Sequence, residues 1–137
     1  MNTIVLVSCA SKKLGVRARA EDLYVSDLFQ KSLAYARSLR PAAIFILSAK
    51  HGLVQPDEQI DPYNETLNTM RPPEIMAWSE RVLDQLRKRA DVEQDHFVFL
   101  AGDKYRRYLL PRLRSVDVPM EGLRIGEQLS WLNGRLL

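Results

Sequence analysis

The sequence of 137 residues predicts an α/β protein: a single three-layer α/β/α domain around a mostly parallel sheet of about four strands. Short apolar runs alternate with segments of helical periodicity, which is typical of βαβ units. The runs are apolar almost throughout, as in strands that are buried on both faces. The length suits one hydrophobic core, and no repeat or linker divides residues 1–137, so we expect one domain.

Four segments are expected as strands. Thr3–Val7, Ala42–Leu47 and His96–Leu100 are apolar runs of strand length, rich in β-branched and aromatic residues, and we expect them at the centre of the sheet. Val116–Val118 is a weaker fourth strand. Alternation with helices predicts that these strands run parallel.

Helical segments lie between these runs. Ser26 is placed to cap a helix that ends before Pro41, because serine is a favourable N-cap and proline stops a helix. Pro72 begins a second helix, since proline is favourable in a first turn. A short helix that Pro111 interrupts and a last helix after Gly122–Gly126 complete the expected elements.

The segment Ser48–Leu67 follows the second expected strand and carries the candidate site. It combines a lysine, a histidine, several acids, a tyrosine and two prolines without an amphipathic period, so we expect a long loop. Loops at the carboxyl ends of parallel strands bind ligands in open α/β sheets. The turn Cys9–Lys13 leaves the same edge, so we expect both segments to line one pocket.

Two groups of site residues are expected. Lys50 and His51 can act as electrophilic groups toward a phosphate or an oxyanion. Asp57 or Glu58 can act as a general base or stabilise positive charge on a sugar, although exposed turn residues are the alternative. The expected substrate-binding residues are Ser8, Cys9, Ser11, Lys12, Lys13, Tyr24, Tyr63, Asn64, Thr66, Gly102, Tyr105 and Gln128.

Some of these residues have two interpretations. Cys9 beside two lysines can be a nucleophile, but a single cysteine at a strand end is more often a small buried hydrophobic residue. Tyr24 or Tyr63 can stack on a base, or Tyr63 can be a packing residue. Ser8 and Ser11 can form an anion-binding turn with their backbone N–H groups.

Composition narrows the classes of function. The net charge of +3 is concentrated in the first twenty residues and in Lys104–Arg114, which can form a phosphate-binding face or a solvated surface. No P-loop or dinucleotide fingerprint is present, and two histidines and one cysteine give no zinc set, so no cofactor or metal is expected. A lone cysteine suits the cytoplasm, and Thr3–Val7 is too short to span a membrane, so no membrane partner is expected.

Several motifs together resemble a small family of bacterial and phage proteins of unknown function. The motifs are Ser8–Lys13, Asp22–Ser26, Ser48–Leu53, Pro62–Leu67, Leu100–Gly102 and Gly122–Leu132. That family is similar to the catalytic domain of archaeosine synthase, which modifies a 7-deazaguanine base in tRNA. Cys9, Lys13, Tyr24 and Ser26 match that domain's motif, although Ser8 stands where the motif has proline.

The resemblance implies a uracil-DNA-glycosylase-like fold and an enzyme that acts on a nucleobase or nucleoside. The reaction would be N-glycosidic bond cleavage, a hydrolase activity, or base modification, with nucleic acid or a nucleotide as the partner. The alternative is a non-catalytic module that binds a nucleotide or nucleic acid, because phosphate contacts do not require catalytic carboxylates.

Overall fold

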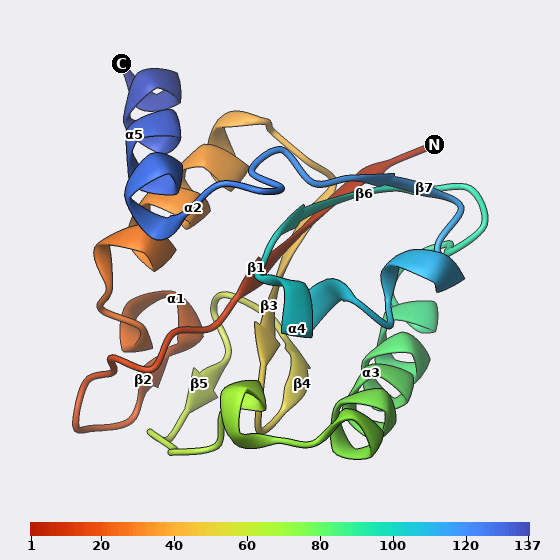
Figure 1. The fold of residues 1–137 in the computed structure, drawn as a ribbon, viewed down its shortest axis with the longest axis horizontal. Helices are drawn as coiled ribbons and strands as arrows, with labels where there is room; N and C mark the ends of the chain where they lie inside the picture. The colour runs from red at the N-terminus through yellow and green to blue at the C-terminus, as the bar shows by residue number, and fades with distance from the viewer.

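A computed structural model describes residues 1–137 and shows an α/β fold around a five-stranded sheet (Figure 1). The strands are Thr3–Ser8 (β1), Ala18–Arg19 (β2), Ala43–Ser48 (β3), Gly52–Val54 (β4), Gln59–Ile60 (β5), His96–Leu100 (β6) and Ser115–Asp117 (β7). The helices are Ala20–Leu23 (α1), Asp27–Ser38 (α2), Pro72–Arg87 (α3), Asp103–Arg106 (α4) and Ile125–Leu136 (α5), with 3-10 turns at Leu67–Thr69 and Leu110–Arg112. The sheet order is β4-β3-β1-β6-β7, and β4 alone runs antiparallel.

All four expected strands lie in this sheet and run parallel, so that prediction is confirmed. β1 is the central strand: Val5 pairs with Ile44 of β3 on one side and with Val98 of β6 on the other. Its residues Ile4–Val7 are all buried, which explains why the run is apolar throughout rather than alternating.

The helices cover the sheet from two sides. α2 and α5 pack together on one side of the strands and α3 lies on the other (Figure 1). The Ser26 hydroxyl accepts a hydrogen bond from the Phe29 N–H at 3.1 Å, which confirms the predicted cap of α2. Pro72 is the first residue of α3, as predicted. None of the helices is both long enough and apolar enough to cross a lipid bilayer.

The expectation of strand-free loops around the site is wrong in two places. Gly52–Val54 forms β4, which pairs with the end of β3 from Ser48↔Gly52 to Ile46↔Val54. Gly52 has a φ of +76°, a conformation that glycine adopts without steric cost, and it lies in the tight turn between the two strands. Gln59–Ile60 (β5) lies in the same segment and pairs with β2, so it is a second strand within the expected loop. A strand of two or three residues is too short to show an alternating pattern, so the sequence gives no signal for it.

Candidate functional site

The carboxyl ends of β1 and β6 border a cavity of about 580 Å³, here named the main cavity. Its walls come from the turn after β1, the start of α2, the segment after β6 and the start of α5. Half of its lining residues are apolar, among them Leu28, Phe29 and Met120. Six of the predicted substrate-binding residues line it: Ser8, Cys9, Ser11, Gly102, Tyr105 and Gln128.

A smaller cavity of about 140 Å³ lies on the other side of the Cys9 turn. Predicted residues from both loops line this side cavity, namely Cys9, Ser11, Lys13, Tyr63, Asn64 and Thr66, and Tyr105 joins them from α4. Cys9, Ser11 and Tyr105 belong to both linings, so the two cavities meet at Cys9. The structure therefore brings together the Cys9–Lys13 turn and the end of the Ser48–Leu67 segment, as the strand order predicts.

Cys9 is half-buried rather than part of the closed core. Its backbone N–H donates to the Leu47 carbonyl at 2.9 Å, which continues the β1–β3 ladder into the turn. Its thiol donates to the Tyr105 hydroxyl at 3.5 Å, and burial raises the pKa of Tyr105, which keeps that hydroxyl protonated. The thiol is thus held at the junction of the cavities by a fixed hydrogen-bond partner.

Lys13 carries the positive charge nearest to this junction. Its ammonium group lies 4.5 Å from the centroid of the Tyr63 ring and 5.7 Å from that of Tyr24. It also donates to the Ser11 carbonyl at 3.3 Å. Burial lowers the pKa of Lys13, and the nearby Cys9 opposes this shift in part. A lysine that is partly desolvated in this way is suited to proton transfer as well as to anion binding.

Tyr24 and Tyr63 form a buried polar network beneath the side cavity. The Tyr24 and Tyr63 hydroxyls are 2.6 Å apart, and the Ser48 hydroxyl donates to the Tyr63 hydroxyl at 2.8 Å. The backbone N–H of His51 donates to the Ser48 hydroxyl at 3.0 Å. Burial raises the pKa of Tyr24 to about 12 and also raises the pKa of Tyr63. The two residues are only 0% and 6% exposed, so the expectation of a stacking platform is wrong and the packing interpretation holds.

His51 lies against this network but lines neither cavity. Its ring meets the Tyr63 ring edge-on, with 5.7 Å between the centroids. Burial lowers the pKa of His51, Lys50 and Arg81 lower it further, and Glu58 opposes the shift. The imidazole is therefore neutral at neutral pH. The Lys50 side chain is exposed. The backbone carbonyl of Lys50 accepts a hydrogen bond from the Arg81 guanidinium at 2.7 Å.

The structure places the two predicted carboxylates elsewhere. Asp57 and Glu58 are exposed and line separate cavities along the first half of β3. The physical reason is β4, which reverses the chain after His51 and carries the following residues back along the sheet. The expectation that an acid lies beside His51 in one pocket is therefore wrong.

Sequence reasoning missed several residues of the main cavity. Ser26 was identified as a helix cap and as a match to the archaeosine synthase motif but not as a substrate-binding residue, and Ser32, Asn68 and Asp103 carried no signal in the sequence. Lys104 also lines this cavity and belongs to the expected basic cluster. Two of the five cations of that cluster form ion pairs, Arg107 with Asp103 and Arg112 with Glu80 of α3, and Lys12 is exposed outside both cavities. No three His, Cys, Asp or Glu side chains gather to hold a metal ion.

The fold and the site define an α/β protein with a mostly parallel sheet and paired cavities at the carboxyl edge of its central strands. The chain belongs to the family of unknown function DUF6884, whose profile matches residues 4–134. It is 32% identical to the uncharacterized protein YfjM of Bacillus subtilis (strain 168) over 144 aligned residues, which cover 97% of this chain and 94% of YfjM. No solved structure matches the chain significantly.

Proposed function

We propose that this protein is an enzyme that acts on a nucleobase or nucleoside, within nucleic acid, at the junction of the main and side cavities. The observation that carries the proposal is the position of the Cys9 thiol, which is partly exposed where the large main cavity meets the small side cavity that Lys13 lines. A cavity of about 580 Å³ has the size of typical small-molecule sites, which supports a ligand as large as a nucleoside.

In this proposal the base lies in the main cavity against Leu28 and Met120. Gln128 supplies a polar contact at the α5 side of the cavity. Its amide nitrogen donates to the Leu123 carbonyl at 2.9 Å, so its amide oxygen is left to accept from an N–H edge of the base. The side cavity, next to Lys13, receives the part of the ligand that gains negative charge.

The groups at the junction favour base modification over N-glycosidic cleavage. Glycosidases generally use a pair of carboxylates, whereas the side cavity presents a thiol, an ammonium group and a single carboxylate, that of Glu65. The proposed step is addition of the Cys9 S–H across a C=N or C=C bond of the base. The S–H bond breaks and a bond forms between the sulfur and a carbon of the base. The electron pair of the former C=N or C=C π bond goes to the neighbouring atom of the base. That atom takes up the proton, and Lys13 can carry it. No oxidant or reductant is required.

The finer fold assignment belongs to the same proposal. Helices on both sides of the sheet support a three-layer α/β/α arrangement of the uracil-DNA-glycosylase-like kind (Figure 1). Such a fold would relate this protein to enzymes that act on extruded bases. A cytoplasmic location is also proposed, because a reducing compartment keeps the single thiol available.

One observation favours the second candidate, a non-catalytic module that binds a nucleotide or nucleic acid. Asp57 and Glu58, the carboxylates expected to act as a base, are exposed and line neither the main nor the side cavity. A module of this kind would bind the same ligand and leave it unchanged.

The experiment incubates the protein with single-stranded oligonucleotides that carry uracil or a 7-deazaguanine and with a duplex that carries a mismatched base, followed by mass analysis of the released nucleosides and of the intact protein. Cys9→Ser should lower turnover by about 100-fold or more and abolish any covalent adduct. Lys13→Gln should lower turnover, whereas Lys31→Gln, the matched control on α2, should not. Turnover by Cys9→Ser at the parental rate would refute the proposal. Binding by the parent without turnover of any substrate would favour the binding module.

A further inference from the structure

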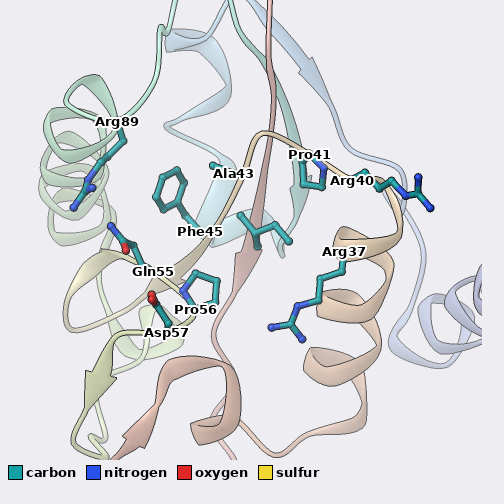
Figure 2. A pocket seen from close by; sticks show the side chains of 10 residues that line it. Arg37, Arg40, Pro41, Ala43, Phe45, Gln55, Pro56, Asp57 and Arg89 are labelled. Carbon is teal, nitrogen blue, oxygen red and sulfur yellow. The ribbon is translucent and has the colours of Figure 1, made fainter.

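A third cavity, of about 580 Å³, lies along the first half of β3 and shares no lining residue with the cavities at Cys9 (Figure 2). We name it the arginine cavity, because Arg37, Arg40 and Arg89 line it. Arg37 comes from the end of α2, and Arg89 follows the end of α3. Figure 2 shows Arg37 and Arg89 on opposite sides of Phe45 of β3; the Arg37 side chain points toward the middle of the cavity, whereas the Arg89 guanidinium points away from Phe45.

Arg89 is held in place by a neutral partner. In the amide orientation that satisfies its neighbours, the Gln55 side-chain oxygen accepts from both terminal nitrogens of Arg89, at 2.9 and 3.0 Å. A guanidinium fixed by an amide keeps its full charge, unlike one that is paired with a carboxylate. The Arg89 side chain is therefore preorganised for binding an anion.

Arg37 is only partly neutralised. Its guanidinium donates to Glu21 at 2.7 Å, but the same carboxylate lies 3.6 Å from Arg19, so one negative charge is shared by two positive ones. Asp57 is the one acidic residue of the cavity lining, and it forms no ion pair. The lining thus keeps a net positive charge.

Arg40 gives an independent indication. It follows α2 with a φ of +48°, the left-handed conformation that glycine adopts at this position in most helices and that other L-residues rarely adopt. When a residue with a charged side chain adopts a rare backbone conformation, a function of that residue is a reasonable hypothesis. In Figure 2 its guanidinium points outward from the cavity, where it adds positive charge to the rim.

We propose that the arginine cavity binds a phosphate group, either of a nucleic-acid strand or of a free nucleotide. Guanidinium groups bind phosphate through two parallel hydrogen bonds and remain charged at all physiological pH values. Arg37 and Arg89 are exposed and line one open hollow from the ends of two different helices rather than forming a row along one helix, which fits a compact anion with several oxygens better than an extended acidic peptide. This goes beyond the proposed reaction, because phosphate binding here requires no turnover at Cys9.

The test measures binding of a short fluorescein-labelled single-stranded oligonucleotide by fluorescence anisotropy over a series of salt concentrations. Arg37→Gln and Arg89→Gln should each weaken binding about tenfold and lower the slope of log K against log salt by about one. Arg114→Gln is the matched control: the same charge is removed from an exposed arginine that forms no ion pair, and binding should stay within about twofold. Asp57→Asn should tighten binding, because it removes the one negative charge of the lining. Thermal melting shows whether each variant is folded.

Competition by inorganic phosphate and by a nucleoside monophosphate identifies the source of the phosphate. An oligonucleotide that binds more tightly than the monophosphate indicates a nucleic-acid strand, and equal affinity indicates a free nucleotide; both results support the phosphate site. Folded Arg37→Gln and Arg89→Gln variants that bind like Arg114→Gln would overturn it, as would preferential binding of polyglutamate over every phosphate probe. The readout here is binding, whereas the test of the proposed reaction is turnover by Cys9→Ser, so loss of binding in Arg37→Gln and loss of turnover in Cys9→Ser are separate results and the two proposals fail separately.

Discussion

Replacing Tyr63 with phenylalanine tests whether the polar network under the side cavity stabilises the fold. The change removes only the hydroxyl, which accepts from Ser48 at 2.8 Å and lies 2.6 Å from the Tyr24 hydroxyl. The ring stays, and with it the contact to the Lys13 ammonium at 4.5 Å. The perturbation is therefore confined to hydrogen bonding.

The expected cost follows from what the missing hydroxyl leaves behind. The Tyr24 hydroxyl loses its partner at a residue that is 0% exposed, and the buried Ser48 hydroxyl loses its acceptor. A buried polar group without a partner costs about 1–3 kcal/mol, so we expect the free energy of unfolding to fall by about 2 kcal/mol. For a chain of 137 residues, this lowers Tm by roughly 7 °C.

The assay is thermal and urea unfolding followed by circular dichroism. Tyr35→Phe is the matched control, because the same atom is removed from a half-buried tyrosine whose hydroxyl makes no hydrogen bond and whose ring packs on Trp131 with 5.0 Å between the centroids. Tm of the control should change by less than about 2 °C. If Tyr63→Phe melts like Tyr35→Phe, the network adds nothing to stability and the reasoning is refuted.

The remaining predictions concern the turn that begins β4. A Cβ on Gly52 would lie 2.2 Å from the Gln85 amide oxygen at a φ of +76°, so Gly52→Ala should lower the unfolding free energy by about 1–3 kcal/mol in urea titrations. Gly134 lies in α5 with open space around it, so Gly134→Ala should raise the unfolding free energy by up to about 1 kcal/mol; equal effects of the two changes would contradict the steric argument. Burial lowers the pKa of His51, so the folded chain keeps it neutral where the unfolded chain binds a proton below pH 6.5. The His51 contribution is complete above pH 6.5 and is lost as the pH falls below 6.5 and through the lowered pKa of the folded state; the decline should be smaller in His51→Gln, and an identical pH profile would exclude His51 as its source.

The fold was predictable where one physical effect dominates. The runs at Thr3–Val7 and Ala42–Leu47 become central strands because an apolar β-branched segment has few alternatives to burial. The start of α2 was predictable from Ser26, since capping is a local interaction. The strand Gly52–Val54 was not, because three residues carry no periodicity and the strand forms on the edge that β3 offers.

In the candidate site, too, some features could be predicted from the sequence and others could not. The meeting of Cys9 with Thr66 follows from strand order, because loops at the carboxyl edges of neighbouring parallel strands lie close together. The displacement of Asp57 follows from β4, which reverses the direction of the chain and was not predicted. The burial of Tyr63 depends on a hydroxyl partner, Tyr24, that is distant in the sequence and that periodicity cannot identify.

The central place of β1 has a consequence for how the chain is made. β1 leaves the ribosome before β6, yet Val5 pairs with Val98, and that partner emerges only after the long segment between the two strands has been synthesised. Until then one edge of an apolar strand has no hydrogen-bonding partner, which is a state prone to aggregation. Contacts between residues so far apart in the sequence also slow folding. Nascent chains that stop before β6 should therefore depend on chaperones, and solubility should rise sharply once His96–Leu100 has been added.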